Sequence, residues 1–357
     1  MTQSDLVLWP SLQRAGLVQG EAPEAGQVET PWFVKVLLAI SGWLAALFIL
    51  GFIGAAFILV FRNNVAAFIT GSALIGVAYA LIRIPKNEFI AHMALAISLA
   101  GQILFFWGLF RVFERQYEAS WAMIAVLEIC LAVFIPNFVH RVISTLIAAV
   151  AFHIFLILVG AHFMFSGLIL IMVAAFWLNE FRWSQHMDRF RAMGYGLVLA
   201  LIPLKGSLLF QEYWWRYWFR HKQTEVWVQP WMGELLCGVA LLYVIWQLLI
   251  RYRQPLQSHV AIAALVAGAI LSFVSIEAQG ITVGLTIVLL GFSNANRVLL
   301  GLGILSLLFY ISSYYYLLND TLLAKAQTLL VIGLVLLAAR WLMTRLFPVH
   351  GETQNVQ

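Results

Sequence analysis

The first long uncharged stretch of the chain, residues 36 to 61, reads VLLAISGWLAALFILGFIGAAFILVF. It is apolar on every side of a helix, whereas a strand of a membrane barrel alternates apolar and polar residues. About 20 apolar residues in a helix cross the roughly 30 Å hydrocarbon layer of a bilayer. The stretch therefore predicts a transmembrane helix and restricts the chain to the folds of membrane proteins.

The composition extends this prediction to the rest of the chain. Hydrophobic residues make up 63% and charged residues 10%, whereas soluble domains average about 45–50% and about 25%. So few charges cannot cover a water-facing surface. We therefore predict an all-α fold, a polytopic transmembrane helix bundle of about 12 spans. The predicted spans are approximately 36 to 61, 65 to 82, 89 to 110, 121 to 135, 142 to 159, 163 to 179, 192 to 210, 231 to 250, 260 to 276, 281 to 292, 298 to 317 and 322 to 342.

The domain organisation follows from these spans. Residues 1–31 are predicted to form a polar cytoplasmic N-terminal segment, and they lack the basic start and apolar core of a cleaved signal peptide. Residues 32–347 form the transmembrane helical domain, and residues 348–357 a disordered C-terminal tail. The spans at 121 to 135 and 281 to 292 are shorter than a full crossing requires.

The orientation is predicted from the basic residues, because loops rich in Lys and Arg stay on the cytoplasmic side. Of the 21 Lys and Arg residues, 13 fall on the side of the N-terminus and 7 on the other, and Lys205 lies within a span. Both termini are therefore predicted to be cytoplasmic, and the aromatic loop from 211 to 230 is predicted to be external.

Two stretches of the sequence carry a family resemblance. The first is PWFVKVLLAISGWLAALFILGFIGAAF at 31 to 57. The second, at 283 to 341, contains an LGF-x-x-x-NR turn, the block YYYLLNDTLLAK and a last span that contains a glycine. The chain resembles an uncharacterised family of bacterial multi-pass membrane proteins that is known only as a domain of unknown function.

The resemblance implies a location in the bacterial inner membrane. Members are often encoded beside a related membrane domain and a small protein with a GDYxxLxY motif, which implies a partner protein in a membrane complex. This chain contains no GDY motif itself. The resemblance implies no reaction, substrate or cofactor.

Four ionisable residues within the spans form the candidate intramembrane polar site: Glu128, Lys205, Glu234 and Lys325. A charge at the centre of a bilayer costs at least about 2.5–3.5 kcal/mol, so such residues are rare and often functional. Lys205 and Glu234 lie at nearly the same depth on consecutive spans, and we expect them to neutralise each other. The alternative is that both side chains extend separately to the membrane surface, as is also expected of Lys325.

Two further features have both a functional and a structural interpretation. Pro203 and Gly206 flank Lys205, which is typical of broken transporter helices but also of a simple packing kink. Glu128 lies deep within its span, where it either takes part in proton coupling or forms a neutral, hydrogen-bonded structural contact.

The predicted external loop contains a cluster of aromatic and basic residues. The candidate lipid or partner face consists of Trp214, Trp215, Arg216, Trp218 and Arg220. The two arginines are four residues apart and share one helical face, where they are suited to bind an anionic group. The alternative is an aromatic belt that only anchors the loop at the level of the lipid headgroups.

No motif predicts an enzyme, because the sequence has no HExxH, P-loop or GxSxG motif. We therefore predict no catalytic residue, metal or cofactor. The expected partners are membrane lipids and a protein of a membrane complex, and the scattered charges exclude nucleic acid. The function favoured by the sequence is a subunit or scaffold of an inner-membrane complex. The alternatives are a transporter of a small or lipid-like substrate and a lipid-modifying membrane enzyme.

Overall fold

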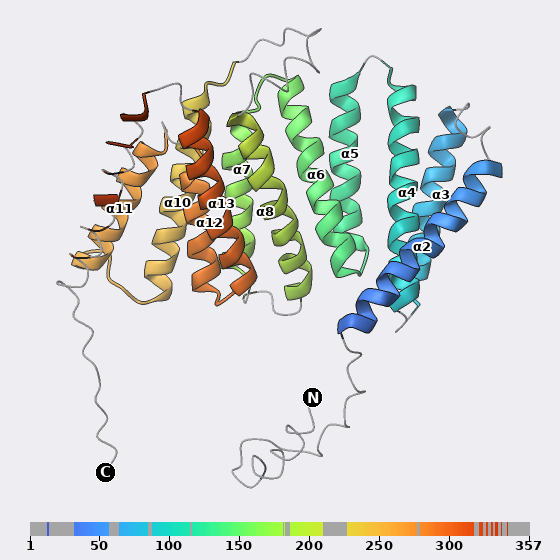
Figure 1. The fold of residues 1–357 in the computed structure, drawn as a ribbon, viewed down its shortest axis with the longest axis horizontal. Helices are drawn as coiled ribbons and strands as arrows, with labels where there is room; N and C mark the ends of the chain where they lie inside the picture. The colour runs from blue at the N-terminus through green and yellow to red at the C-terminus, as the bar shows by residue number, and fades with distance from the viewer. Residues whose placement is uncertain are drawn as a thin grey trace. The chain divides into compact units, whose positions relative to one another are not determined.

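The computed structural model describes most of the membrane region of the chain. The described residues are 13, 32–56, 64–84, 88–114, 116–180, 182, 186–209, 227–276, 279–317 and ten residues between 321 and 341. Their regular elements are all helical, and eleven helices are resolved (Figure 1). The predicted all-α helix bundle is confirmed. The helices are α2 (Trp32–Ala56), α3 (Asn64–Ile82), α4 (Glu88–Val112), α5 (Tyr117–Phe134), α6 (Phe138–Leu158), α7 (Met164–Leu178), α8 (Met187–Leu209), α10 (Pro230–Arg251), α11 (His259–Val274), α12 (Ile281–Ser293) and α13 (Arg297–Leu317).

Eleven of the twelve predicted spans coincide with these helices. Six of the described helices are long and apolar enough to cross a membrane, and α5 is among them because it begins at Tyr117. Helices α7, α11 and α12 are shorter, and the 13 residues of α12 reach only about 20 Å. The twelfth predicted span lies mostly outside the described residues, as do both terminal segments, so the number of crossings stays a prediction.

The chain divides into two compact units. Unit 1 comprises residues 1–120 and 134–140, and unit 2 comprises residues 121–133 and 141–357. In unit 1, α4 packs against both α2 and α3. The contact with α3 depends on small residues, since a Cβ atom on Gly71 would lie 2.7 Å from the carbonyl oxygen of Gly101. Such close backbone approach through glycine is the usual way in which membrane helices associate.

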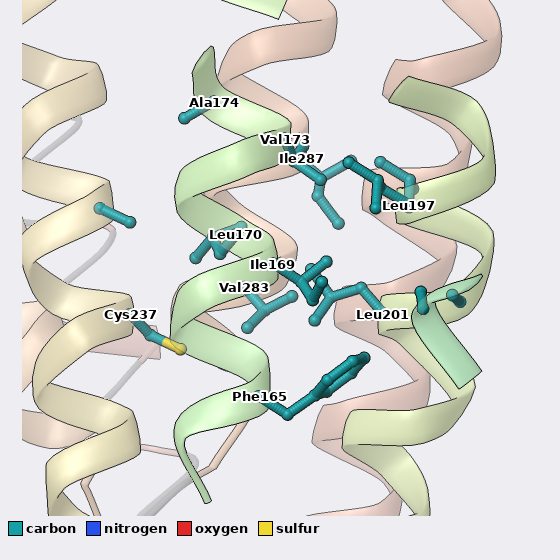
Figure 2. Close-up of a cluster of buried hydrophobic side chains, with 14 of the residues drawn as sticks. Phe165, Ile169, Leu170, Val173, Ala174, Leu197, Leu201, Cys237, Val283 and Ile287 are labelled. Carbon is teal, nitrogen blue, oxygen red and sulfur yellow. The ribbon is translucent and has the colours of Figure 1, made fainter. Parts of the chain in front are cut away.

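Unit 2 contains the larger core, and two of its three short helices, α7 and α12, are the most enclosed. Helix α7 contacts α8, α10 and α12, while α12 also contacts α10 and α13. Figure 2 shows Phe165, Ile169 and Leu170 of α7 among Leu201 of α8 and Val283 of α12. Helices α7 and α12 bury about half of their residues, and most exposed large apolar side chains of this unit lie on other helices, chiefly α10, α11 and α13.

The helices of unit 2 begin with recognisable local signals. Pro230 occupies the first turn of α10, where its missing N–H costs no helical hydrogen bond. The Ser258 hydroxyl accepts a hydrogen bond from the backbone N–H of Ala261 and so caps α11. Gly280 adopts φ of 95° directly before α12, a left-handed conformation that glycine tolerates best. These signals fix where α10, α11 and α12 enter the core.

Candidate functional site

A buried ion pair joins α8 to α10 in the core of unit 2. The Lys205 ammonium donates a hydrogen bond to the Glu234 carboxylate oxygen Oε1. Both side chains are enclosed, with 3% of the Lys205 side chain and 1% of the Glu234 side chain exposed. The contact expected from their equal depth is therefore present, and neither side chain extends to the membrane surface.

Tight backbone packing positions this pair. Gly233 precedes Glu234, and a Cβ atom on Gly233 would lie only 2.0 Å from the carbonyl oxygen of Phe163. On the other helix, a Cβ on Gly206 would lie 2.4 Å from the ring of Phe309. Glycine next to each charged residue therefore lets α10 approach Phe163, which precedes α7, and lets α8 approach Phe309 of α13.

Helix α8 continues through Pro203 and ends at Leu209. The interpretation of Pro203 as the break in a discontinuous transporter helix is therefore wrong. The proline lies inside a continuous helix, and Gly206 admits the Phe309 ring rather than a change of backbone direction. The Ile202 carbonyl, next to the proline, accepts a hydrogen bond of 3.1 Å from the Tyr310 hydroxyl.

One further polar contact lies next to the pair, on the same face of α10. Cys237 is one turn after Glu234, and its thiol lies 3.7 Å from the Ser166 hydroxyl oxygen of α7. Figure 2 shows Cys237 pointing from α10 toward α7. Both cysteines of the chain are free thiols, Cys237 buried and Cys130 exposed. The surroundings of the pair are thus polar but closely packed, and they suit a fixed neutral ion pair better than the binding of a ligand.

Glu128 is a second buried acid of unit 2, and its surroundings differ. The residue is 0% exposed, and Ser144 of α6 is its polar neighbour, but neither carboxylate oxygen makes a hydrogen bond to a described residue. No ion pair to Glu128 occurs among the residues that the structure describes. The four members of the candidate intramembrane site are therefore not all brought together, because Glu128 stands apart from the Lys205–Glu234 pair.

The remaining sequence candidates fall where the structure gives no description. Lys325 of the polar site and the whole candidate lipid or partner face lie outside the described residues. That face consists of Trp214, Trp215, Arg216, Trp218 and Arg220. Its role stays a prediction from the sequence.

Unit 1 contains a polar cluster that is not among the candidates predicted from the sequence. The Ser98 hydroxyl lies 2.8 Å from Nε2 of His140, and the Gln102 amide donates to the Ser98 hydroxyl over 3.4 Å. All three residues are buried. Ser98 and Gln102 are four residues apart inside an apolar span, so the sequence alone indicates that they share one face of the helix. The contact of His140 with them depends on tertiary packing.

A second network lies at the end of unit 2 where α7 ends and α8 begins. Glu180 follows α7 and forms an ion pair of 3.1 Å with Arg191 of α8. Burial raises the pKa of Glu180, and Arg191 and Arg251 oppose the shift. Asn294 donates a hydrogen bond of 2.9 Å to the Trp177 carbonyl and accepts one of 3.0 Å from Arg251. The network connects the helix ends at one face of the unit.

Metal chemistry finds no support within the described parts of the chain. No group of three or more His, Cys, Asp or Glu side chains there is arranged to hold a metal ion. His153 and His162 both lie near α7, but they come with no third ligand of that kind. Burial lowers the pKa of His162, which favours its neutral form.

The helices define the class of protein to which the chain belongs. The chain is an α-helical membrane protein with several transmembrane helices, which the composition had predicted. A family model described as "Domain of unknown function (DUF4401)" matches residues 31–346, and the chain belongs to this family. The match confirms the predicted resemblance to a family of unknown function. No curated protein and no solved structure matches the chain.

Proposed function

We propose that the chain is a structural subunit of a complex in the bacterial inner membrane. The single observation that carries the proposal is the enclosure of Lys205 and Glu234, the only charged pair within the described spans, in a tightly packed core. A transport site has to exchange its ligand with water, whereas this pair is sealed by helices in glycine-mediated contact. A sealed pair fixes the register of α8 against α10 and so favours a rigid framework.

The exposed surface of the helices supports the same role. Large apolar side chains cover the outer faces, among them Phe48 at 78%, Phe273 at 76% and Phe292 at 73% exposure. Lipid covers such faces in a monomer, and helices of a partner protein cover part of them in a complex. The short loops predicted by the sequence leave little room for a soluble catalytic domain.

Transport of a small or lipid-like substrate is the second candidate. It predicts a water-filled path to Glu128 or to the Lys205–Glu234 pair. The observation that favours transport is that Glu128 is fully buried and forms no ion pair with a described residue. The lipid-modifying enzyme is the weakest candidate, because the sequence offers it only one cluster of charged residues, Arg216 and Arg220 with Lys205 and Glu234.

Photo-crosslinking in intact membranes tests the proposal. A photoreactive amino acid replaces Phe48 or Phe273 on the outer faces, and a matched control replaces Trp177, which is 1% exposed. We expect a crosslinked protein of one defined mass from at least one outer position and none from Trp177. Mass spectrometry after purification in mild detergent identifies the partner. Crosslinks to lipid alone from a set of positions around every outer face would contradict the proposal.

The orientation is tested separately. We propose that both termini are cytoplasmic, because basic residues favour that side. A single cysteine introduced at Gln223 should react with a membrane-impermeant reagent in intact cells, whereas one at Thr353 should react only after lysis. Reaction of both cysteines in intact cells would contradict this orientation.

A further inference from the structure

Helices α6 and α8 come into close contact within unit 2, and each carries an arginine in its first turn. A Cβ atom on Gly196 of α8 would lie 2.6 Å from the Val142 carbonyl oxygen and 2.7 Å from Cβ of Thr145, so the two helices are in close contact there. Arg189 lies seven residues before Gly196, and Arg141 lies four residues before Thr145. Residues at these spacings share one helical face. Arg141 and Arg189 therefore both lie on the facing sides of the two helices.

The charges at this point are not balanced. The positive charge of Arg189 repels that of Arg141. The negative charge of Asp188 attracts Arg141 and partly offsets this repulsion. Asp188 is exposed, whereas both arginines are half-buried. Two cations and one anion leave a net positive charge, to which the N-terminus of α8 adds its partial positive charge.

The guanidinium groups also retain hydrogen-bonding capacity. The Nε atoms of Arg141 and Arg189 are buried and have no hydrogen-bond partner among the residues that the structure describes. The Nε atom of the neighbouring Arg191 also makes no hydrogen bond to a described residue, but it forms an ion pair of 3.1 Å with Glu180. Two like charges held side by side with free donors need an anion between them, and guanidinium groups match the geometry of phosphate oxygens.

We propose that Arg141 and Arg189 bind the phosphate of an anionic phospholipid headgroup. Arg141 is the fourth residue of α6 and Arg189 the third of α8. At about 1.5 Å per residue, both lie within roughly 5 Å of the helix starts, which is the depth of the headgroup region. A phosphodiester with one negative charge matches the net charge of the two arginines and Asp188. The proposal is independent of the role of the chain in a complex.

Binding to purified, delipidated protein tests the proposal. The probes are phosphatidylglycerol, which is anionic, phosphatidylcholine, which is zwitterionic, and inorganic phosphate, each followed by native mass spectrometry and by the melting temperature. The variants are Arg141→Gln and Arg189→Gln, and the matched control is Arg182→Gln, an exposed arginine between α7 and α8. We expect the wild type and the control to bind phosphatidylglycerol more tightly than phosphatidylcholine. Each variant should bind phosphatidylglycerol about tenfold more weakly or worse, because it loses a charge-assisted contact.

Two lysine variants separate the effect of the charge from the effect of the guanidinium shape. Arg141→Lys and Arg189→Lys retain the charge but lose the planar fork, so they should bind with intermediate affinity, and they serve if a Gln variant does not fold. Equal binding of phosphatidylglycerol by the wild type and by both Gln variants would overturn the proposal. Equal stabilisation by inorganic phosphate at matched concentration would also overturn it, since the site would then hold a free anion rather than a lipid.

Discussion

Glu234 and Glu128 are both fully buried carboxyl groups in unit 2, and they are accommodated in different ways. Glu234 lies against the Lys205 ammonium in a buried ion pair that joins α10 to α8. Glu128 interacts with the Ser144 hydroxyl and has no ion-pair partner among the described residues. One acid is thus balanced by a full charge, whereas the other has only a neutral hydroxyl as its polar neighbour.

The difference determines how much each acid contributes to the fold. Removing one member of a buried ion pair leaves an uncompensated charge, which is far more costly than losing a single neutral hydrogen bond. Substitution of Lys205 or Glu234 should therefore strongly lower the stability of the fold, whereas substitution of Glu128 should change it little. The predictions that follow test this contrast, from the largest effect to the smallest.

Glu234→Gln should destabilise the protein by about 3–5 kcal/mol, because the Lys205 ammonium is left buried without its counter-charge. The free energy of unfolding in mixed detergent micelles measures the effect. The double variant Lys205→Met with Glu234→Gln should recover most of the loss, since no unpaired charge remains. Additive effects of the two single substitutions in a double-mutant cycle would show that the pair contributes no coupling.

Gly233→Ala should destabilise the protein by about 1–3 kcal/mol, because its Cβ would meet the Phe163 carbonyl oxygen at 2.0 Å. The matched control is Gly76→Ala in the middle of α3, where a Cβ meets no atom within 4 Å. Alanine favours helices by about 1 kcal/mol over glycine, so the control should be neutral or slightly stabilising. The same unfolding assay compares the two, and equal effects would mean that the region around Glu234 is not tightly packed.

Glu128→Gln should change the free energy of unfolding by less than about 1 kcal/mol, because the amide keeps a group that can bond with the Ser144 hydroxyl. This substitution is chemically the same as Glu234→Gln, so it isolates the effect of the surroundings. A loss as large as that at Glu234 would indicate a cation near Glu128 and would remove the contrast between the two acids.

Glu180 combines features of Glu234 and Glu128. It pairs with Arg191, as Glu234 pairs with Lys205, yet burial raises its pKa. A carboxyl whose folded pKa exceeds its ordinary value of 4.5 contributes stability that is complete below pH 4.5 and is lost as the pH rises through the folded pKa. Glu180→Gln does not titrate. The melting temperature of this variant should therefore rise relative to that of the wild type from pH 4.5 to pH 7. A relative fall over this range would contradict the sign.

The sequence predicted the helices and the pair for physical reasons that apply to any membrane protein. Apolar runs of sufficient length define spans, and two opposite charges at equal depth on consecutive spans have a strong reason to meet. Neither inference requires knowledge of which helices are neighbours in space. The 13-residue length of α12 was likewise visible in the short run at 281 to 292.

Contacts between helices that are distant in the sequence were not predictable in this way. The cluster of Ser98 with His140 and the meeting of Arg141 with Arg189 depend on which faces of the helices pack together. The continuity of α8 through Pro203 depends on the neighbours of that helix, since proline alone permits either a break or an unbroken helix. Composition and spacing carry too little information about these contacts.

The accessibility of Cys237 tests most directly whether the region around the Lys205–Glu234 pair is sealed. Cys237 is 0% exposed and lies one turn from Glu234, and replacing the exposed Cys130 with alanine leaves it as the sole thiol. The measurement is the labelling of this variant in liposomes by a small, water-soluble methanethiosulfonate reagent. We predict no labelling of the folded protein and full labelling after denaturation in detergent. Rapid labelling of the folded protein would show that water reaches the pair, and it would contradict the framework role in favour of transport.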